Sequence, residues 1–522
     1  MERDGVITVF LSLILTVILS VMGTCLETAR GAGLSCRVQM AASSAVQSVF
    51  AGYDSSLFAS WQLFFRRTSD RNGSDLAGEM EKCAAACGSA SETALIPALD
   101  WFAFTVQKAE MDHLVFAVDQ NGAVFEAAVM DYMKTGAVRI AWEELSSRLS
   151  PEGGGEQSQA LAEGSRKEEE FGIGSLWGRY QTIKEQAAAS AGKQQEEESE
   201  EESEEASAAE PAAVPAGQQE ITADNPVEKL QELFKYGILA LVMPETSELS
   251  GRSLPQEGLP SRLSADVRNH CTDGSPVASG DGSLLLVNEY LIRFLDNALS
   301  DKEEKAYDIE YVIAGKASDQ ENLKAVINRL LWIREFINLA YAMTDVSMKS
   351  QADALAVSLA GWTGAAPVVE TLSILILAAW SYAEALSDVR ILMGGGHVPL
   401  WKTSETWHIS LQGIMKMGKA GNHDYRETEK KGLSYEDYLR LLLLMTDPSA
   451  RDYRAMDCIQ IHCRQDDPSF SFACCVYAAR GTLTAESELL FLCLPGASGL
   501  QIGHYSGYQI VRTGSYCYGG SG

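Results

Sequence analysis

Apolar and polar positions are unevenly distributed along the chain, and the longest uncharged stretch lies near its start. Val6 to Leu26 contain no charged residue and are mostly apolar. At 1.5 Å per residue, a helix of this length spans about 30 Å, the thickness of the hydrocarbon core of a bilayer. The pattern therefore predicts a transmembrane helix over residues 6–26, preceded by a short cytoplasmic tail over residues 1–5.

Small hydroxyl residues recur at every fourth position inside this run. They are Thr8, Ser12, Thr16, Ser20 and Thr24. Such residues let a second helix approach closely in lipid, so we identify this hydroxyl ladder as a candidate for helix packing. In the alternative interpretation, each hydroxyl bonds to a carbonyl of its own helix and only fills space. The ladder also drifts by about 40° per step, so a straight partner helix could follow only part of it.

An uncleaved anchor explains the N-terminus better than a secretory signal peptide does. A signal peptide has a positive start and a shorter apolar core, whereas Arg3 is flanked by Glu2 and Asp4. Residues 41–50 continue in a helical pattern, which predicts that the helix runs on past the membrane. Lysine and arginine near the span do not decide its orientation. The short tail favours an N-terminus inside the cell and an exported C-terminal part.

The formal net charge is −29, and much of it lies in one segment. Residues 151–225 carry 18 acidic and 5 basic side chains, and eight of the ten residues from Glu196 to Glu205 are glutamate. Repulsion and low apolar content predict a disordered linker there. It divides the exported part into an N-terminal helical part, 27–150, and an α+β C-terminal part, 226–522. The acidic balance argues against nucleic-acid binding.

Periodicity in the C-terminal part predicts mainly helices. The apolar run 372–383 is flanked by Glu370 and Glu384 and is typical of a buried core helix. Residues 322–350 and 351–361 also have a helical pattern, whereas 307–314 alternate with period two and predict a strand. Ser434 and Asp437 form a capping box, and three glycines from Gly394 predict a helix end. Strands are expected over 470–477, 487–494 and 508–518. The predicted fold class is α+β and helix-dominated, with one N-terminal transmembrane helix and late antiparallel strands.

The motifs of common enzymes and metal sites are missing from the sequence. No nucleophile elbow, phosphate loop or dinucleotide fingerprint occurs. The seven histidines are scattered singly, and the eleven cysteines do not form an even framework. We therefore predict no enzyme, no catalytic or metal residues and no cofactor. Five charged residues on otherwise apolar helices are interpreted as structural, because buried charges need partners: Arg334, Glu335, Glu384, Asp388 and Arg390.

Several blocks of sequence carry a family resemblance. They include 5–15, Leu26 to Arg30, Tyr307 to Lys324, Leu331 to Asn338, Ala379 to Arg390 and Tyr435 to Leu443. The chain resembles an uncharacterised family of single-pass proteins from Gram-positive anaerobes that is associated with tight-adherence (Flp-type) pilus systems. The minor pseudopilins of such systems, with one N-terminal helix and an exported domain, are the nearest functional analogy.

A pseudopilin-like processing site is matched only in part. Gly5 and Val6 stand where such a site has its glycine and the start of the apolar run. The glutamate of that pattern is replaced by Phe10, and the next acidic residue is Glu27. Gly5–Val6 is therefore a doubtful processing site.

Two functions follow as hypotheses. The first is a non-enzymatic surface protein in the cell membrane, which is a structural or assembly component of a pilus system. Its partners would be membrane lipid, other membrane helices or pilus components, with a homo-oligomer among the alternatives. The second is an envelope receptor or ligand-binding module tethered by the same anchor. The tail of five residues is too short to signal by itself, which favours the first hypothesis.

Overall fold

The computed structural model describes residues 2–88, 101–133, 226–243, 249–255, 257–270, 283–300, 305–361, 366–418, 432–490 and 507–519. The predicted linker, 151–225, lies outside them. The chain forms two compact units. Unit 1 comprises Met1–Gly136, Pro255–Tyr290 and Asp447–Gly522, and unit 2 comprises Ala137–Leu254 and Leu291–Thr446. Unit 1 thus combines segments from both sides of the predicted linker.

Unit 1 contains the long N-terminal helix and the sheet. Its main elements are α1 (Glu2–Ala51), α2 (Ser55–Trp61), β1 (Arg66–Arg67), α3 (Ser74–Gly88), β2 (Thr105–Phe116), α4 (Ala123–Met133), α10 (Ala265–Arg268), α18 (Pro448–Asp466), β3 (Cys475–Ser487) and β4 (Tyr508–Cys517). Helix α11 (Ser283–Phe294) crosses the boundary between the units. The predicted continuation of the N-terminal helix beyond its apolar run is confirmed by α1.

Strand β3 is the centre of a four-stranded antiparallel sheet. Strand β2 pairs along one of its edges, from Thr105 opposite Glu486 to Phe116 opposite Val476. Strand β4 and the two-residue β1 pair with its other edge. The expected late antiparallel strands are therefore present as β3 and β4. Strand β3 covers the gap between the strands predicted over 470–477 and 487–494, and residues 491–494 lie outside the described residues.

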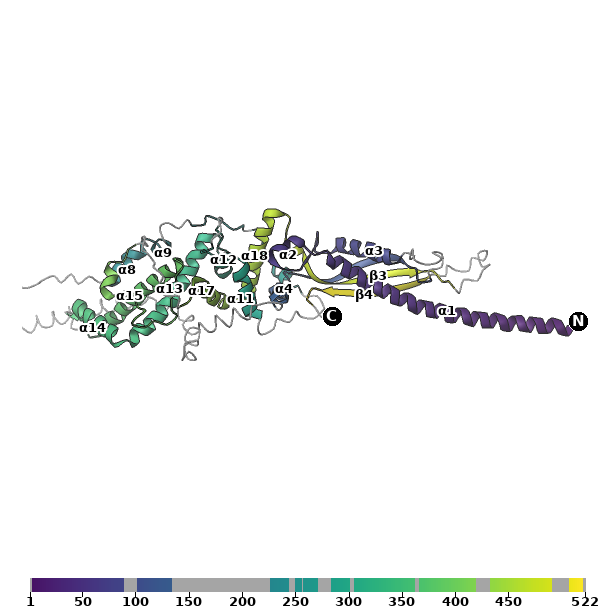
Figure 1. The fold of residues 1–522 in the computed structure, drawn as a ribbon, viewed down its shortest axis with the longest axis horizontal. Coiled ribbons are helices and arrows are strands. Elements are labelled where there is room, and N and C mark those ends of the chain that lie inside the picture. Colours follow the sequence, from purple (N-terminus) through teal and green to yellow (C-terminus); the bar gives the residue numbers. More distant parts are fainter. Residues whose placement is uncertain are drawn as a thin grey trace, which may run out of the picture. The chain divides into compact units, whose positions relative to one another are not determined.

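The C-terminal half of α1 packs on this sheet, and the N-terminal half extends beyond it (Figure 1). Two glycines that face each other across β3 and β4, Gly481 and Gly514, make room for the helix. A Cβ on Gly514 would lie 2.8 Å from the carbonyl oxygen of Ala42, and one on Gly481 would lie 2.6 Å from Val46 Cγ2. Side chains at these two positions would push α1 off the sheet.

Unit 2 is helical in the residues described. Its main helices are α8 (Pro226–Phe234), α9 (Ile238–Val242), α12 (Asp308–Ala314), α13 (Asp319–Thr344), α14 (Val346–Ala360), α15 (Ala366–Met393), α16 (Leu411–Met415) and α17 (Tyr435–Leu444). Helix α15 packs against α13 and α14 and forms the centre of the unit. It is apolar enough to cross a membrane, but 61% of its most apolar window is buried. The predicted core helix over 372–383 is confirmed.

The strand predicted over 307–314 is wrong, because this segment is helix α12. Alternating apolar residues indicate a strand only when the residues between them face solvent. Here Asp308 and Glu310 are fully buried. Asp308 accepts a hydrogen bond from Arg252 Nη2 at 2.7 Å, and Glu310 accepts one from the Tyr435 hydroxyl at 2.7 Å. The polar positions belong to the core, so the alternation carries no information about a sheet face.

Two predicted helix ends are confirmed in detail. Ser434 and Asp437 form the reciprocal capping box at the start of α17. After α15, Gly395 adopts a φ of +82°, and the Gly396 amide donates to the Ile391 carbonyl at 2.9 Å. The long helix predicted over 322–350 is instead divided at Asp345, whose side chain accepts from the Met348 amide and starts α14.

Candidate functional site

The hydroxyl ladder lies on the exposed half of α1. Every described residue from 7 to 26 is exposed or half-exposed, and this part of the helix is long and apolar enough to cross a membrane. A signal sequence would pass the same test. The predicted processing position, Gly5–Val6, lies within α1 near its start.

Three hydroxyls of the ladder bond within their own helix. Ser12 Oγ donates to the Val9 carbonyl at 2.8 Å, and Thr16 Oγ1 donates to the Ser12 carbonyl at 2.7 Å. Thr24 Oγ1 donates to the Ser20 carbonyl at 2.6 Å. What these residues can offer a second helix is therefore their small size. Their role in packing stays a prediction.

Immediately after the apolar run, α1 changes from exposed to half-buried. From Glu27 onward, buried positions recur at helical spacing down the face that meets the sheet: Glu27, Arg30, Leu34, Val38, Ala41, Ala45 and Val49. The first two of them carry charge and are 1% and 6% exposed. A buried charge requires a partner and hydrogen bonds.

Both charges are satisfied by contacts that fix α1 to the end of the sheet. Arg30 Nη1 lies 2.8 Å from Glu27 Oε1. The same guanidinium donates to the carbonyls of Trp101 at 2.6 Å and Glu488 at 2.9 Å, and to Ser487 Oγ at 2.7 Å. One side chain thus joins α1, the segment that leads into β2 and the end of β3. We call this group the junction.

A second group of buried charges lies in unit 2, between α13, α15 and the loop 399–410. Arg334 on α13 donates through Nη2 to Asp388 Oδ2 on α15 at 2.8 Å. Lys402 Nζ lies 2.6 Å from Glu384 Oε1 and 2.7 Å from Asp388 Oδ1. All four side chains are fully buried. We call them the charged cluster; its two cations balance its two anions.

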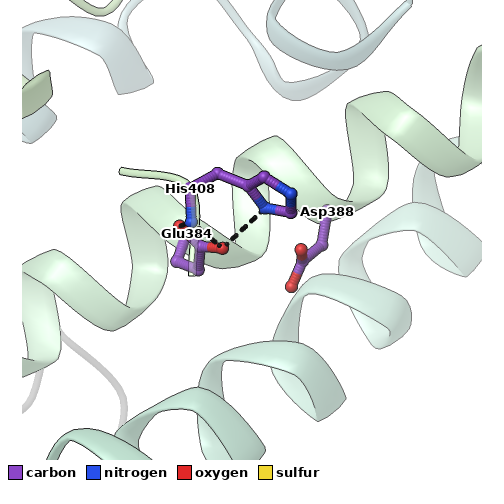
Figure 2. Close-up of side chains that lie close together, drawn as sticks. All are labelled: Glu384, Asp388 and His408. Atoms are coloured by element: carbon purple, nitrogen blue, oxygen red, sulfur yellow. Dashed lines mark hydrogen bonds and ion pairs between the residues drawn. The ribbon is translucent and has the colours of Figure 1, made fainter. Parts of the chain in front are cut away.

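His408 is the member of this neighbourhood that reaches solvent. Its side chain is 32% exposed, and its Nδ1 lies 3.0 Å from Glu384 Oε1. Figure 2 shows this contact and the carboxyl group of Asp388 on the same side of α15. Glu384 also accepts hydrogen bonds from the backbone amides of His408 and Ile409. The Glu384 carboxylate therefore holds the backbone of the loop and also binds Lys402.

The surroundings of these groups keep them charged. Burial would raise the pKa of Glu384, but the hydrogen bond with His408 and the charge of Lys402 lower it, and the result lies below the ordinary value. Burial would lower the pKa of Arg334, but Tyr438 and Asp388 raise it above its ordinary value. The cluster is thus an ionic structure whose members stabilise each other's charges.

Glu384, Asp388 and His408 bring possible metal-ligand atoms within 4.8 Å of one another. The Lys402 ammonium nevertheless lies within hydrogen-bond distance of both carboxylates, and it also donates to the Thr406 carbonyl at 2.9 Å. A metal ion would have to displace this lysine from its partners. The donor set therefore fits the resident ammonium better than a metal.

The five charged residues interpreted as structural do not all behave alike. Arg334, Glu384 and Asp388 belong to the charged cluster. Arg390 donates to the carbonyls of Leu241 and Gly418 and ties two segments to α15. Glu335 differs, because its Oε1 is buried and accepts no hydrogen bond from the described residues. Burial raises its pKa to about 8.

Sequence reasoning missed two members of this site, Lys402 and His408. Both lie in a loop without periodicity, so no pattern linked them to α15. The spacing of Glu384 and Asp388 was the available signal, because it puts two carboxylates on one face of a helix and calls for a cation.

Unit 1 also contains a cavity of about 340 Å³. Its apolar lining includes Met111, Leu114 and Phe116, and its polar lining includes Arg71, His113 and His270. Buried Asp119 accepts from Arg71 Nη2 at 3.0 Å and lies 3.2 Å from His270 Nδ1, so it orients both side chains. His113 has a φ of +53° at an irregularity of β2.

These features define an α+β protein with a long apolar helix at its N-terminus and a helical unit stabilised by buried charges. Residues 216–487 match a family described as a family of unknown function, DUF5702. The match covers more than half of the 522 residues, and the chain belongs to this family. No curated protein and no solved structure matches the chain. The matched residues include the charged cluster but not α1.

Proposed function

We propose that this protein is a non-enzymatic, membrane-anchored surface protein and a structural or assembly component of a tight-adherence pilus system. In this proposal the apolar half of α1 lies in the cell membrane, the N-terminus is inside, and the rest of the chain is exported. The observation that carries the proposal is the continuity of α1. One helix passes from the exposed apolar segment into the core of unit 1 without an interruption.

This continuity supports an assembly role over that of a simple tether. A tether only has to keep a domain near the membrane, and a flexible linker is sufficient for that. Here the junction of Glu27 and Arg30 fixes the helix to the end of β3 and to the segment that leads into β2, at the point where α1 leaves the apolar segment. A force or an orientation imposed on the membrane helix is therefore transmitted to the sheet.

Contacts in the membrane would then be made through the hydroxyl ladder. Residues of this size allow backbones to approach closely, and van der Waals packing is a main source of helix association in lipid. The hydroxyls of Ser12, Thr16 and Thr24 suit this role, because each donates its proton to a carbonyl of its own helix and presents no unsatisfied donor to lipid. The expected partners are other membrane helices of the pilus system or a second copy of this chain.

Photo-crosslinking in the native membrane tests the proposal. Benzoylphenylalanine is placed at Leu13, on the exposed segment beside the ladder. An assembly component should give discrete protein adducts, whereas a tether in lipid should give lipid adducts alone. Lipid adducts without protein adducts would overturn the assembly role. Protease protection on intact cells checks the orientation, and the export proposal fails if residues beyond the anchor are cut only after the cells are opened.

A matched pair of variants tests the ladder itself. Three ladder residues are replaced by leucine: Ser12, Thr16 and Ser20. The control replaces three residues on the opposite side of the helix by leucine: Ile14, Ile18 and Val21. Both variants should insert, because leucine is favourable in the bilayer. The ladder variant should lose the protein adducts and the control should keep them. Equal adducts in the two variants would show that the ladder only fills space.

The cavity in unit 1 favours the second hypothesis, an envelope receptor or ligand-binding module. It combines an apolar lining with oriented polar groups, as small-molecule sites do. The two hypotheses differ in what the anchor does. A receptor needs the cavity and tolerates the ladder variant, whereas an assembly component needs the ladder. A neighbouring gene for a secretion ATPase would also support the assembly role.

A further inference from the structure

Three large apolar side chains lie beside α1 where it leaves the sheet. Trp101 is 43% exposed, Phe102 is 37% exposed and Leu490 is 47% exposed. We call these three residues the collar. They come from the segment before β2 and from the segment after β3, so two distant parts of the chain supply them.

Each collar residue is fixed to α1 by a specific contact. The Trp101 carbonyl accepts from Arg30 Nε at 2.6 Å. The Leu490 amide donates to Glu27 Oε2 at 3.2 Å. A Cβ on Gly33 would lie 2.5 Å from Cε1 of the Phe102 ring. The lack of a side chain at Gly33 therefore lets the ring lie against the helix. The position of the collar along α1 is therefore defined.

The charges that α1 itself carries at this level are turned away from solvent, and the exposed charge nearest to them along the collar segments is Glu488, two residues before Leu490. Glu27 and Arg30 are buried and paired with each other. The exposed residues of α1 from this pair to Arg37 are uncharged: Thr28, Ala29, Ala32 and Cys36. The collar and Leu26, which is 46% exposed, thus continue the exposed apolar surface of the first half of α1.

We propose that the collar sits in the interface between lipid headgroups and acyl chains, so that this end of unit 1 rests on the bilayer. The inference depends on the proposed membrane span. If residues 7–26 cross the hydrocarbon core, their length of about 30 Å brings Glu27 to the interface. Hydrogen bonds between Arg30 and Trp101 and between Leu490 and Glu27 place the collar at the same depth. Tryptophan and other aromatic residues are favoured at this depth, and exposed apolar side chains gain burial there.

The consequence for the protein is a fixed height and orientation. A single helix in lipid can tilt and rotate, and a domain attached to it would follow. The collar adds contacts with the bilayer from two further segments, one before β2 and one after β3, and these contacts restrict the tilt of α1. The sheet is then presented to its partners at a constant distance from the membrane surface.

Lipid photo-crosslinking at single positions of the full-length protein tests this inference. Benzoylphenylalanine replaces Trp101 or Leu490 in the collar, Leu15 in the proposed span, or Phe64 as the control. Phe64 is 39% exposed and stacks on Tyr518, whose hydroxyl donates to the Phe50 carbonyl near the other end of α1. The chains are expressed in native membranes whose phospholipid is radiolabelled, and the adducts are counted after irradiation.

The expected result is lipid adducts at Trp101 and Leu490 with yields similar to Leu15, and no lipid adducts at Phe64. Lipid adducts at Leu15 without any at the two collar positions would overturn the collar inference and leave the membrane span intact. Protein adducts in place of lipid adducts at the collar would also overturn it, because a protein partner would then cover these residues. Absence of lipid adducts at Leu15 would refute the proposed span itself.

Discussion

Lys402 provides the sharpest test of the charged cluster. Replacing it with methionine keeps much of the apolar stem and removes the ammonium. Glu384 and Asp388, both fully buried, would then face each other with Arg334 as the remaining cation of the cluster. Removing one partner of a buried ion pair costs about 3–5 kcal/mol, because the other charge is left uncompensated.

This cost is large compared with the stability of a domain, about 5–15 kcal/mol. At about 1.4 kcal/mol for each factor of ten, the open form of the loop should become roughly 10² to 4 × 10³ times more populated. The reporters are the backbone amides of His408 and Ile409, which donate to Glu384. Hydrogen exchange of these amides in the full-length protein in detergent measures the opening directly.

The effect should depend on pH in a defined direction. Lys402 is one of the groups that keep the pKa of Glu384 below its ordinary value. Without the lysine, burial raises this pKa, so proton uptake relieves the repulsion as the pH falls. After correction for intrinsic exchange, the difference between Lys402→Met and wild type should be larger at pH 7 than at pH 5.

Two further variants make the test specific. Lys349→Met removes an exposed lysine of α14 and should leave the exchange of the loop unchanged. Adding Glu384→Gln to Lys402→Met removes the uncompensated charge and should restore part of the protection. Exchange of His408 and Ile409 that is the same in wild type and Lys402→Met would refute the argument that the ammonium holds the cluster together.

Three other perturbations test separate parts of the structure. Gly514→Ala should destabilise unit 1 by about 1–3 kcal/mol in thermal unfolding, since the added Cβ meets the Ala42 backbone; an unchanged melting temperature would show that α1 can shift without cost. Arg30→Leu removes the cation beside buried Glu27 and the donor to Ser487 and Glu488, so it should speed hydrogen exchange over 484–490; unaltered exchange there would show that Arg30 does not hold the end of β3 to α1. Because burial raises the pKa of Glu335 to about 8, the folded carboxyl stays protonated while the unfolded one ionises near 4.5. Stability should therefore fall between pH 4.5 and pH 8 in the wild type, and Glu335→Gln should show less of this fall; an identical pH profile for the two proteins would contradict it.

The features that could be predicted from the sequence are those with a long or local signal. The apolar run of α1, the core helix α15 and the capping box at Ser434 were predicted, because hydrophobic length and cap chemistry act within one element. Strand β2 was missed, since exposed charges such as Lys108 and Glu110 hide its alternation. The helix at Ile459–Asp466 was not predicted either. This segment continues α18, whose start lies in the preceding residues.

The charged cluster shows the same contrast between features with a local sequence signal and features without one. Arg334, Glu384 and Asp388 were predicted to need partners because they are charges on otherwise apolar helices, and the structure pairs them in the charged cluster. Their cation Lys402 was not recognised, because a loop residue that meets a helix across 14 positions leaves no periodic signal. Ion pairs between residues that only the tertiary structure brings together cannot be predicted from a local sequence pattern.

The order of the strands along the chain has a consequence for synthesis. Strand β2 is made early, yet its partner β3 follows 381 residues later at the Thr105–Glu486 contact. Until then the sheet-facing side of α1 and the edge of β2 have none of their native strand partners. Contacts of such separation form slowly, and open strand edges invite aggregation. The charged side chains of β2 that hid it from prediction, Lys108, Glu110 and Asp112, would protect that edge from other chains while the rest of the protein is made.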